Sequence, residues 1–311
     1  MLKLKDMKKT LFIIALSLLL GVCASAQPLK VQEKTYEKFS KISAEDSFVL
    51  KFYHSETYSV TLKTDERIAA HVQAYVKNGT LYLILDEKGY SPELKKQLRH
   101  KGAAAPVLEA EVYMPTYNAL VIKDKCVLTH SDNFSTETFI LTASDHAVVS
   151  QLNIACSTAE FNVSKNAQVK SAAYVNGKLY LNASNSTQVT LTQEGGNALV
   201  SVGNSAYVDF KSSINALEVE AASSSESHFS GTASFIRIDA SNLSKVDAEL
   251  LEAKEGDIML TGSAKCYVNV IEKLKVNLTG GSMLTFKRSP VFEIDRIVNS
   301  TLIKADDARR K

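Results

Sequence analysis

The sequence has no tryptophan, few aromatic residues and no excess of charge of either sign. Aromatic residues make up 8% of its 311 residues, and 36 basic residues stand against 34 acidic ones. A protein that binds nucleic acid through a basic face needs a clear positive excess, so no nucleic-acid partner is expected. The scarcity of large aromatics suits thin β-structure whose core is filled by Val, Leu, Ile and Ala.

Motifs for catalysis and metal binding are also missing. The histidines show no HxH or HExxH spacing, and no serine lies in a GxSxG sequence, so neither a zinc site nor a nucleophile elbow is predicted. We therefore predict no catalytic residue, no metal site and no cofactor. The histidines are His54, His71, His100, His130, His146 and His228.

Long apolar segments are absent, apart from one short run near the N-terminus. Four lysines precede this run, which covers residues 11–22 and is followed by Ala24-Ser25-Ala26. A run of about 12 residues is too short for a membrane span, which needs ~20. A basic start, a short apolar run and a small-residue site are typical of a signal peptide. We predict a signal peptide over residues 1–26, cleaved between Ala26 and Gln27, and no transmembrane span in the mature chain.

A lipoprotein signal is the alternative, because Cys23 follows Leu20-Gly21-Val22. An acylated cysteine at this position would tether the mature chain to a membrane. Lipoprotein processing favours a small residue directly before the cysteine, and Val22 is branched, so we favour the soluble signal. The expected location is the periplasm, the cell surface or the medium, after export through the inner membrane.

Residues 27–118 predict a β-rich N-terminal part. Apolar and polar residues alternate there with the period of half-buried strands. Asn78-Gly79 separates two alternating segments and predicts a hairpin, because both central residues of a type I′ turn need positive φ. Residues 87–106 break the alternation, and Ser91-Pro92 is typical of an N-cap and first turn. This segment is interpreted as an insertion with a short helix and a solvated basic face.

From residue 119 to 290 the chain repeats with a period near 20. Examples are FNVSKNAQV, LNASNSTQV and VSVGNSAYV. Apolar residues align at Leu128, Val149, Val169, Val189, Val208, Phe229, Val246, Val268 and Phe286. Small residues stand two positions earlier, and turn formers, mostly Ser or Gly, stand five positions earlier.

Such a repeat cannot bury its inward face alone, so neighbouring coils must stack and share one core. The prediction is therefore an all-β parallel β-helix or solenoid, followed by a C-terminal strand and polar tail over residues 291–311. A β-sandwich with strands every 8 to 12 residues is the alternative. The apolar, small and turn-forming positions recur together at fixed offsets in the repeats, and this pattern favours the solenoid.

Three cysteines remain after signal cleavage, which is an odd number for an exported protein. Cys126 and Cys266 are aligned at the small-residue position and are predicted to be buried and too far apart for a disulfide. Cys156 lies near a predicted coil corner.

The sequence resembles the putative auto-transporter adhesin head GIN domain family (DUF2807) of exported Bacteroidetes proteins. The resemblance rests on the lead-in FSKISAEDSFVLKFYHSETYSVTLKTDERI, the hairpin VKNGTLYLIL, the strand VYMPTYNALVI and the serial repeats, over roughly residues 36–290. It implies a right-handed parallel β-helix-like stack and an adhesion-like role without established biochemical activity. Most family repeats have Gly after the turn Ser, where this chain has Asp145, Lys165, Asn185 and Asn242.

Three functional hypotheses follow. The first is an exported, non-enzymatic binding or adhesion-like module, whose Ser, Thr and Asn-rich outer surface would contact a glycan or a protein at the cell surface. The second is a periplasmic or surface scaffold that self-associates through an uncapped coil edge, although the charged tail from residue 306 favours a blunted end. The third is a polysaccharide-active enzyme, which would need paired carboxylates on adjacent coils. The candidate carboxylates are Asp145, Asp209, Glu220, Asp239, Asp247 and Asp257. Asp209 and Asp247 share the position just after the aligned apolar residue but are predicted to lie two coils apart, too far to act as a pair.

Overall fold

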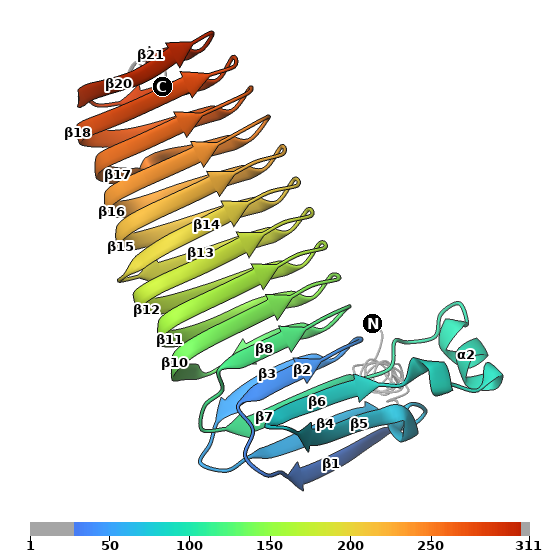
Figure 1. Cartoon of the computed structure of the whole chain (residues 1–311). Helices are drawn as coiled ribbons and strands as arrows, with labels where there is room; N and C mark the ends of the chain where they lie inside the picture. The colour runs from blue at the N-terminus through green and yellow to red at the C-terminus, as the bar shows by residue number, and fades with distance from the viewer. Residues whose placement is uncertain (1–27, 306–311) are drawn as a thin grey trace, which may run out of the picture.

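The computed structural model describes residues 28–305. The chain forms a long β-solenoid with a wider β-rich cap at its N-terminal end (Figure 1). It is 67% strand and 5% helix, with about ten stacked coils, so the predicted all-β stack is confirmed. No helix within the described range is long and apolar enough to cross a bilayer. The predicted signal peptide with its Ala26-Gln27 site, Cys23 and the tail from residue 306 lie outside that range.

The cap contains three antiparallel strand pairs and leads into a parallel stack. Its elements are β1 (Leu29–Thr35), β2 (Lys41–Ala44), β3 (Val49–His54), β4 (Ser59–Asp65), η1 (Ala69–His71), β5 (Val72–Lys77), β6 (Thr80–Leu85), η2 (Glu87–Gly89), α2 (Pro92–Arg99) and β7 (Leu108–Met114). Strand β4 pairs antiparallel with β1 and β7, and β5 pairs antiparallel with β6. Strands β6 and β7 then lie parallel to β2 and β3, so the cap closes the lower end of the stack.

Two local sequence signals lie at turns of the cap. The hairpin at Asn78-Gly79 is confirmed, since these residues have φ of 52° and 69° and join β5 to β6. Helix α2 starts after Ser91, whose hydroxyl oxygen accepts a hydrogen bond from the Leu94 N–H at 3.2 Å. Pro92 occupies the first helical turn, where a missing N–H costs nothing.

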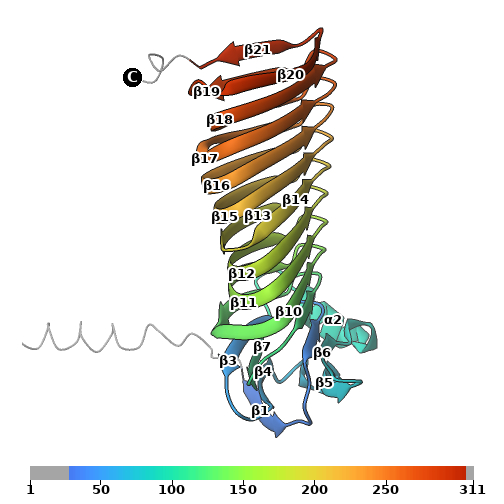
Figure 2. The same cartoon turned by 60° about the vertical axis from the view of Figure 1, so that its left-hand side comes forward.

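The stack begins at β8 and consists of parallel pairs only. Its strands are β8 (Ala119–Ile122), β9 (Val127–Ser131), β10 (Asn133–Ala143), β11 (Val148–Val163), β12 (Gln168–Ala183), β13 (Gln188–Glu194), β14 (Asn197–Val202), β15 (Tyr207–Ala221), β16 (Glu226–Ala240), β17 (Lys245–Leu260), β18 (Lys265–Thr279), β19 (Met283–Lys287), β20 (Val291–Val298) and β21 (Thr301–Lys304). Most coils hold one long strand that bends around the core, as Figure 2 shows. The stack continues past residue 290, because β20 and β21 pair with β18 and β19 as one more coil.

A tight turn closes each coil at the same corner. In the first full turn the Ala147 N–H donates to the Ser144 carbonyl at 3.2 Å, and both central residues, Asp145 and His146, have positive φ. The turns that directly follow again have two central residues with positive φ. This backbone conformation matches the right-handed twist of the strands that the turn connects. The turns also bond to each other, since the His146 N–H donates to the Lys165 carbonyl. Stacking of the turns therefore extends the hydrogen-bonded ladder around the corner.

The predicted alignment of the repeats is right from Leu128 to Val208 and at Val246, and wrong at Phe229, Val268 and Phe286. At each of these three positions the structure places the residue two earlier in the ladder, namely Ser227, Cys266 and Leu284. The observed ladder is Leu128, Val149, Val169, Val189, Val208, Ser227, Val246, Cys266, Leu284 and Leu302. Ser227 is polar but almost fully buried, whereas Phe229 occupies the next inward position. A slip of two residues keeps every side chain on its own face, so the hydrophobic pattern did not detect it.

Candidate functional site

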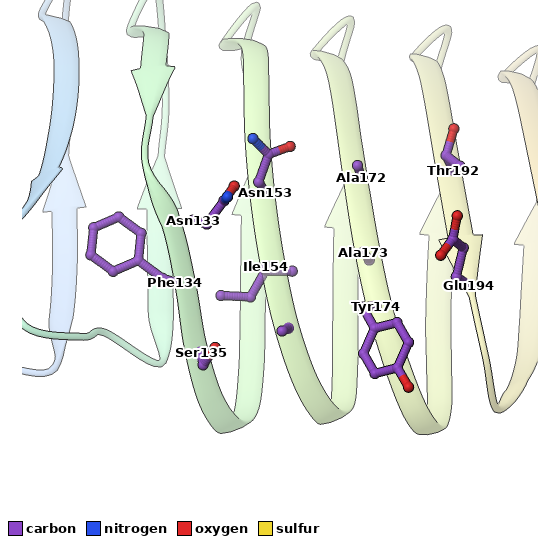
Figure 3. Close-up of a pocket in the computed structure, with 11 residues that line it drawn as sticks. Asn133, Phe134, Ser135, Asn153, Ile154, Ala172, Ala173, Tyr174, Thr192 and Glu194 are labelled. Atoms are coloured by element: carbon purple, nitrogen blue, oxygen red, sulfur yellow. The ribbon is translucent and has the colours of Figure 1, made fainter.

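The clearest hollow on the solenoid lies across β10, β11, β12 and β13. It has a volume of about 480 Å³ and is lined by two parallel rows of outward side chains (Figure 3). One row is Asn133, Asn153, Ala172 and Thr192, and the other is Ser135, Ala155, Tyr174 and Glu194. Each row takes one residue from each of four successive coils. The spacing of the rows is therefore set by the parallel strand register, with ~4.8 Å between coils.

Tyr174 is the one large aromatic side chain among these outward residues. Its side chain is 57% exposed, in contrast to the fully buried aromatics of the core. Ala155, its neighbour on the adjoining strand β11, and Ala172 on β12 are both small, which leaves the ring exposed on that side. A tyrosine ring offers an apolar face and a hydroxyl in one rigid unit, which suits contacts with amphipathic ligands.

Polar groups surround the ring on the same surface. Glu194 lies directly beside Tyr174 in the strand register, and Thr192 lies beside Ala172. Asn133 and Asn153 lie opposite each other on β10 and β11. Amide, hydroxyl and carboxylate groups thus stand within one shallow hollow, where they can donate and accept hydrogen bonds. This combination can hold a polar ligand that also presents an apolar face to the ring.

The ladder relation predicted for Asp209 and Asp247 is confirmed, and the structure adds a histidine between them. His228 on β16 lies in register with Asp209 on β15 and Asp247 on β17. His228 Nε2 lies 3.1 Å from a carboxylate oxygen of Glu226, and Nδ1 lies 3.8 Å from one of Asp247. Lys245 donates to Glu226 at 2.7 Å and, with His228, lowers the pKa of that carboxyl. Glu226, His228, Lys245 and Asp247 thus form a cross-strand polar network on this face.

A pair of carboxylates not recognised in the sequence lies on neighbouring coils. Glu220 on β15 lies in register with Asp239 on β16, and both are exposed. The Ser201 hydroxyl donates to Glu220 at 3.0 Å. Within residues 28–305, no group of three or more His, Cys, Asp or Glu is placed to hold a metal ion.

The three cysteines of residues 28–305 are buried and free of disulfides, as the repeat pattern suggested for Cys126 and Cys266. Burial raises the pKa of Cys126 to about 12 and that of Cys156 to about 11, so both thiols stay protonated at neutral pH. The predicted equivalence of Cys126 and Cys266 is wrong. Cys266 belongs to the ladder of Leu128, whereas Cys126 stands two residues before it.

Sequence reasoning missed the hollow around Tyr174. The alternation places Tyr174 on an outward position, which was available as a signal. The small outward neighbours come from other coils, however, and only the register shows that Ala155 and Tyr174 lie side by side.

Comparison with known families gives one match over most of the chain. The sequence profile described as "Putative auto-transporter adhesin, head GIN domain" (DUF2807) matches residues 38–179 and 152–290. A search of curated proteins finds no match.

Several solved structures from Parabacteroides and Bacteroides species are similar along most of their length. A "putative adhesin" from Parabacteroides merdae ATCC 43184 is 13% identical, with 89% of this chain and 96% of that chain covered at a TM-score of 0.47. A "Putative lipid binding protein" from Parabacteroides distasonis ATCC 8503 is 13% identical, with 89% and 97% covered at 0.41. A "putative adhesin" from Bacteroides fragilis NCTC 9343 is 15% identical, with 90% and 98% covered at 0.33.

Proposed function

Because the chain belongs to the DUF2807 family of head GIN domains, we propose that it is an exported, non-enzymatic binding module of the adhesion-like kind. The observation that carries this proposal is the exposed ring of Tyr174 among amide, hydroxyl and carboxylate side chains on a rigid strand surface. Solenoids offer extended surfaces on which many weak contacts add up along the rod. The rows beside Tyr174 continue onto β15 through Lys211 and Ser213, so a long ligand could follow them.

A glycan is the ligand class that this surface fits best. Sugar rings carry hydroxyls around their edge and C–H groups on their faces, which match the polar rows and the tyrosine ring respectively. The side chains that form the hollow stand on strands rather than on loops, so binding requires little ordering of the protein. A protein ligand is the other expected class.

The substitution Tyr174→Ala should weaken glycan binding at least about tenfold, because the stacking surface is lost while the fold is kept. The measurement is binding to a glycan array, followed by titration calorimetry with the strongest hit. Tyr180→Ala is the matched control, since Tyr180 is also exposed on β12 but does not line the hollow. Equal loss in both variants, or an unchanged affinity in Tyr174→Ala, would place the ligand elsewhere.

The mature N-terminus is expected to be Gln27, in a chain without lipid. Intact mass spectrometry of the protein from fractionated cells measures both the N-terminus and the compartment. A chain that starts at Gln27 in the periplasmic or extracellular fraction supports the soluble binding module. A lipid-modified chain that starts at Cys23 would instead show that the protein is tethered to a membrane.

A further inference from the structure

The last coil of the stack exposes side chains that point into the core in every earlier coil. Ile294 and Ile297 on β20 are 56% and 38% exposed. Their register neighbours one coil earlier, Val276 and Leu278 on β18, are 0% exposed. Phe292 and Leu302 follow the same pattern, since both are only partly buried at the end of ladders whose preceding members are fully buried. The hydrophobic core is therefore open at this end.

The backbone is open at the same place. Within the described chain, β20 pairs only with β18 and β21 pairs only with β19, so each has one free edge. The opposite end of the stack is closed by the cap, where β6 and β7 cover β2 and β3 (Figure 1). A free strand edge beside exposed apolar side chains is a template for pairing with another strand.

We propose that a second copy of this chain covers the open end, through antiparallel pairing of β20 with β20 of the other copy about a two-fold axis. The argument for a second copy is that three of the four residue pairs of β20 are complementary when its sequence is reversed against itself. The exception is the central pair, in which Ile294 lies opposite Asp295. With the axis between residues 294 and 295, Val291 lies opposite Val298 and Phe292 lies opposite Ile297 of the other copy. Glu293 lies opposite Arg296. Directly opposed strand residues stabilise a pair when they are both apolar or carry opposite charges.

The faces of the strand agree with this register. Phe292 and Ile297 are in register with the buried Leu274 and Leu278, so both point toward the core side. Glu293 and Arg296 are in register with Lys275 and Asn277, which stand on the outer side. The irregularity of β20 against β18 falls at Asp295, close to the axis and outside the pairs that carry the complementarity.

Among the charged residues of β20, Arg296 is the one without an ion pair in the described part of the chain. Glu293 lies 2.6 Å from Lys273 and 3.8 Å from Lys275, which also pairs with Asp295 at 3.0 Å. These pairs lie between β18 and β20, and only one of the two Glu293 oxygens, Oε2, lies within hydrogen-bonding distance of a lysine. Arg296 is exposed and makes no ion pair within the described residues. In the dimer, Arg296 of each copy lies opposite Glu293 of the other copy, so two ion pairs form by symmetry.

The test is a charge-swap experiment on the mature chain, measured by sedimentation velocity over a series of concentrations. The wild type is expected to form dimers. R296E and E293R should each raise the dimer dissociation constant at least about tenfold, because each puts like charges opposite each other in both symmetric pairs. An equimolar mixture of the two variants should recover the dimer, since both pairs then have opposite charges again. K170E, on β12 in the middle of the rod and outside the hollow, is the control for a general charge effect.

Three outcomes would overturn the proposal. A wild type that stays monomeric while the β20 amides resist hydrogen exchange would indicate that the chain's own residues 306–311 cover the edge. A monomer with unprotected amides would leave the end to a different partner. Long oligomers, or variants whose mixture does not recover the dimer, would show that copies associate through another surface or in another register. Because these residues lie far from Tyr174 along the rod, loss of the dimer and loss of ligand binding are distinguishable.

Discussion

The substitution Gly231→Ala should destabilise the solenoid by about 3–4 kcal/mol, through backbone conformation and overlap together. Gly231 on β16 has φ of 106°, and a Cβ built on it would lie 1.9 Å from the Ser212 carbonyl oxygen of β15. Positive φ alone costs a non-glycine residue about 1–2 kcal/mol. The overlap with backbone adds to that cost, because β15 cannot move without disturbing its own pairs on both sides. The measurement is the free energy of unfolding in urea, with unfolding monitored by circular dichroism.

Gly79→Ala is the matched control for this experiment. Gly79 also has positive φ, 69°, but a Cβ at this position meets no atom within 4 Å. Its substitution should therefore cost only about 1 kcal/mol, the price of the conformation alone. Equal costs at the two positions would show that the close approach of β15 and β16 relaxes without penalty.

A second large effect is expected in the cap, where Arg67→Ala should cost about 2–3 kcal/mol at neutral pH. The Asp65 side chain is fully buried at the end of β4, and the guanidinium of Arg67 donates to it at 2.9 and 3.1 Å. The Arg67 backbone N–H donates to the same carboxylate at 2.9 Å. Removal of the guanidinium leaves a buried carboxylate without its counter-charge, which is among the costlier single changes in proteins.

The cost of Arg67→Ala should depend on pH in a defined direction. The Arg67 side chain holds the pKa of Asp65 below its ordinary value, so the pair stabilises the fold at neutral pH and loses that contribution as the pH falls through the folded pKa. In the variant, burial without the guanidinium raises the pKa of Asp65. The difference in unfolding free energy between wild type and variant should therefore shrink as the pH falls, first through the raised pKa of Asp65 in the variant and then below the ordinary carboxyl pKa of about 3.9, where the wild type loses its contribution.

The double variant D65N/R67A supplies the control, because a neutral amide carries no charge to be left unpaired. It should be more stable than R67A at neutral pH. Its stability should not depend on the ionisation of residue 65, so it should not gain on the wild type in acid as R67A does. A cost of Arg67→Ala that is the same at neutral and acid pH would mean that the side chain stabilises the cap by packing alone.

The register error after Val208 shows why the stack was predictable and its details were not. Inward and outward positions alternate with a period of two, and turn residues recur about every 20, so both the coil and its corner follow from local sequence. Neither signal distinguishes a register from one shifted by two residues, as the exchange of Ser227 for Phe229 shows. The pairing of the whole stack decides that choice.

The sequence by itself determined the all-β stack, the hairpin at Asn78-Gly79 and the burial of Cys126 and Cys266. Each depends on the conformational preference of a few neighbouring residues or on the period of apolar side chains. The tertiary structure alone decided which residues meet across coils: the hollow around Tyr174, the Glu220 and Asp239 pair, and the exposed ladder ends at Ile294 and Ile297. These features depend on contacts between residues about 20 apart and on whether another coil follows. A sequence pattern marks Ile297 as inward, but only the stack shows that nothing in the described chain covers it.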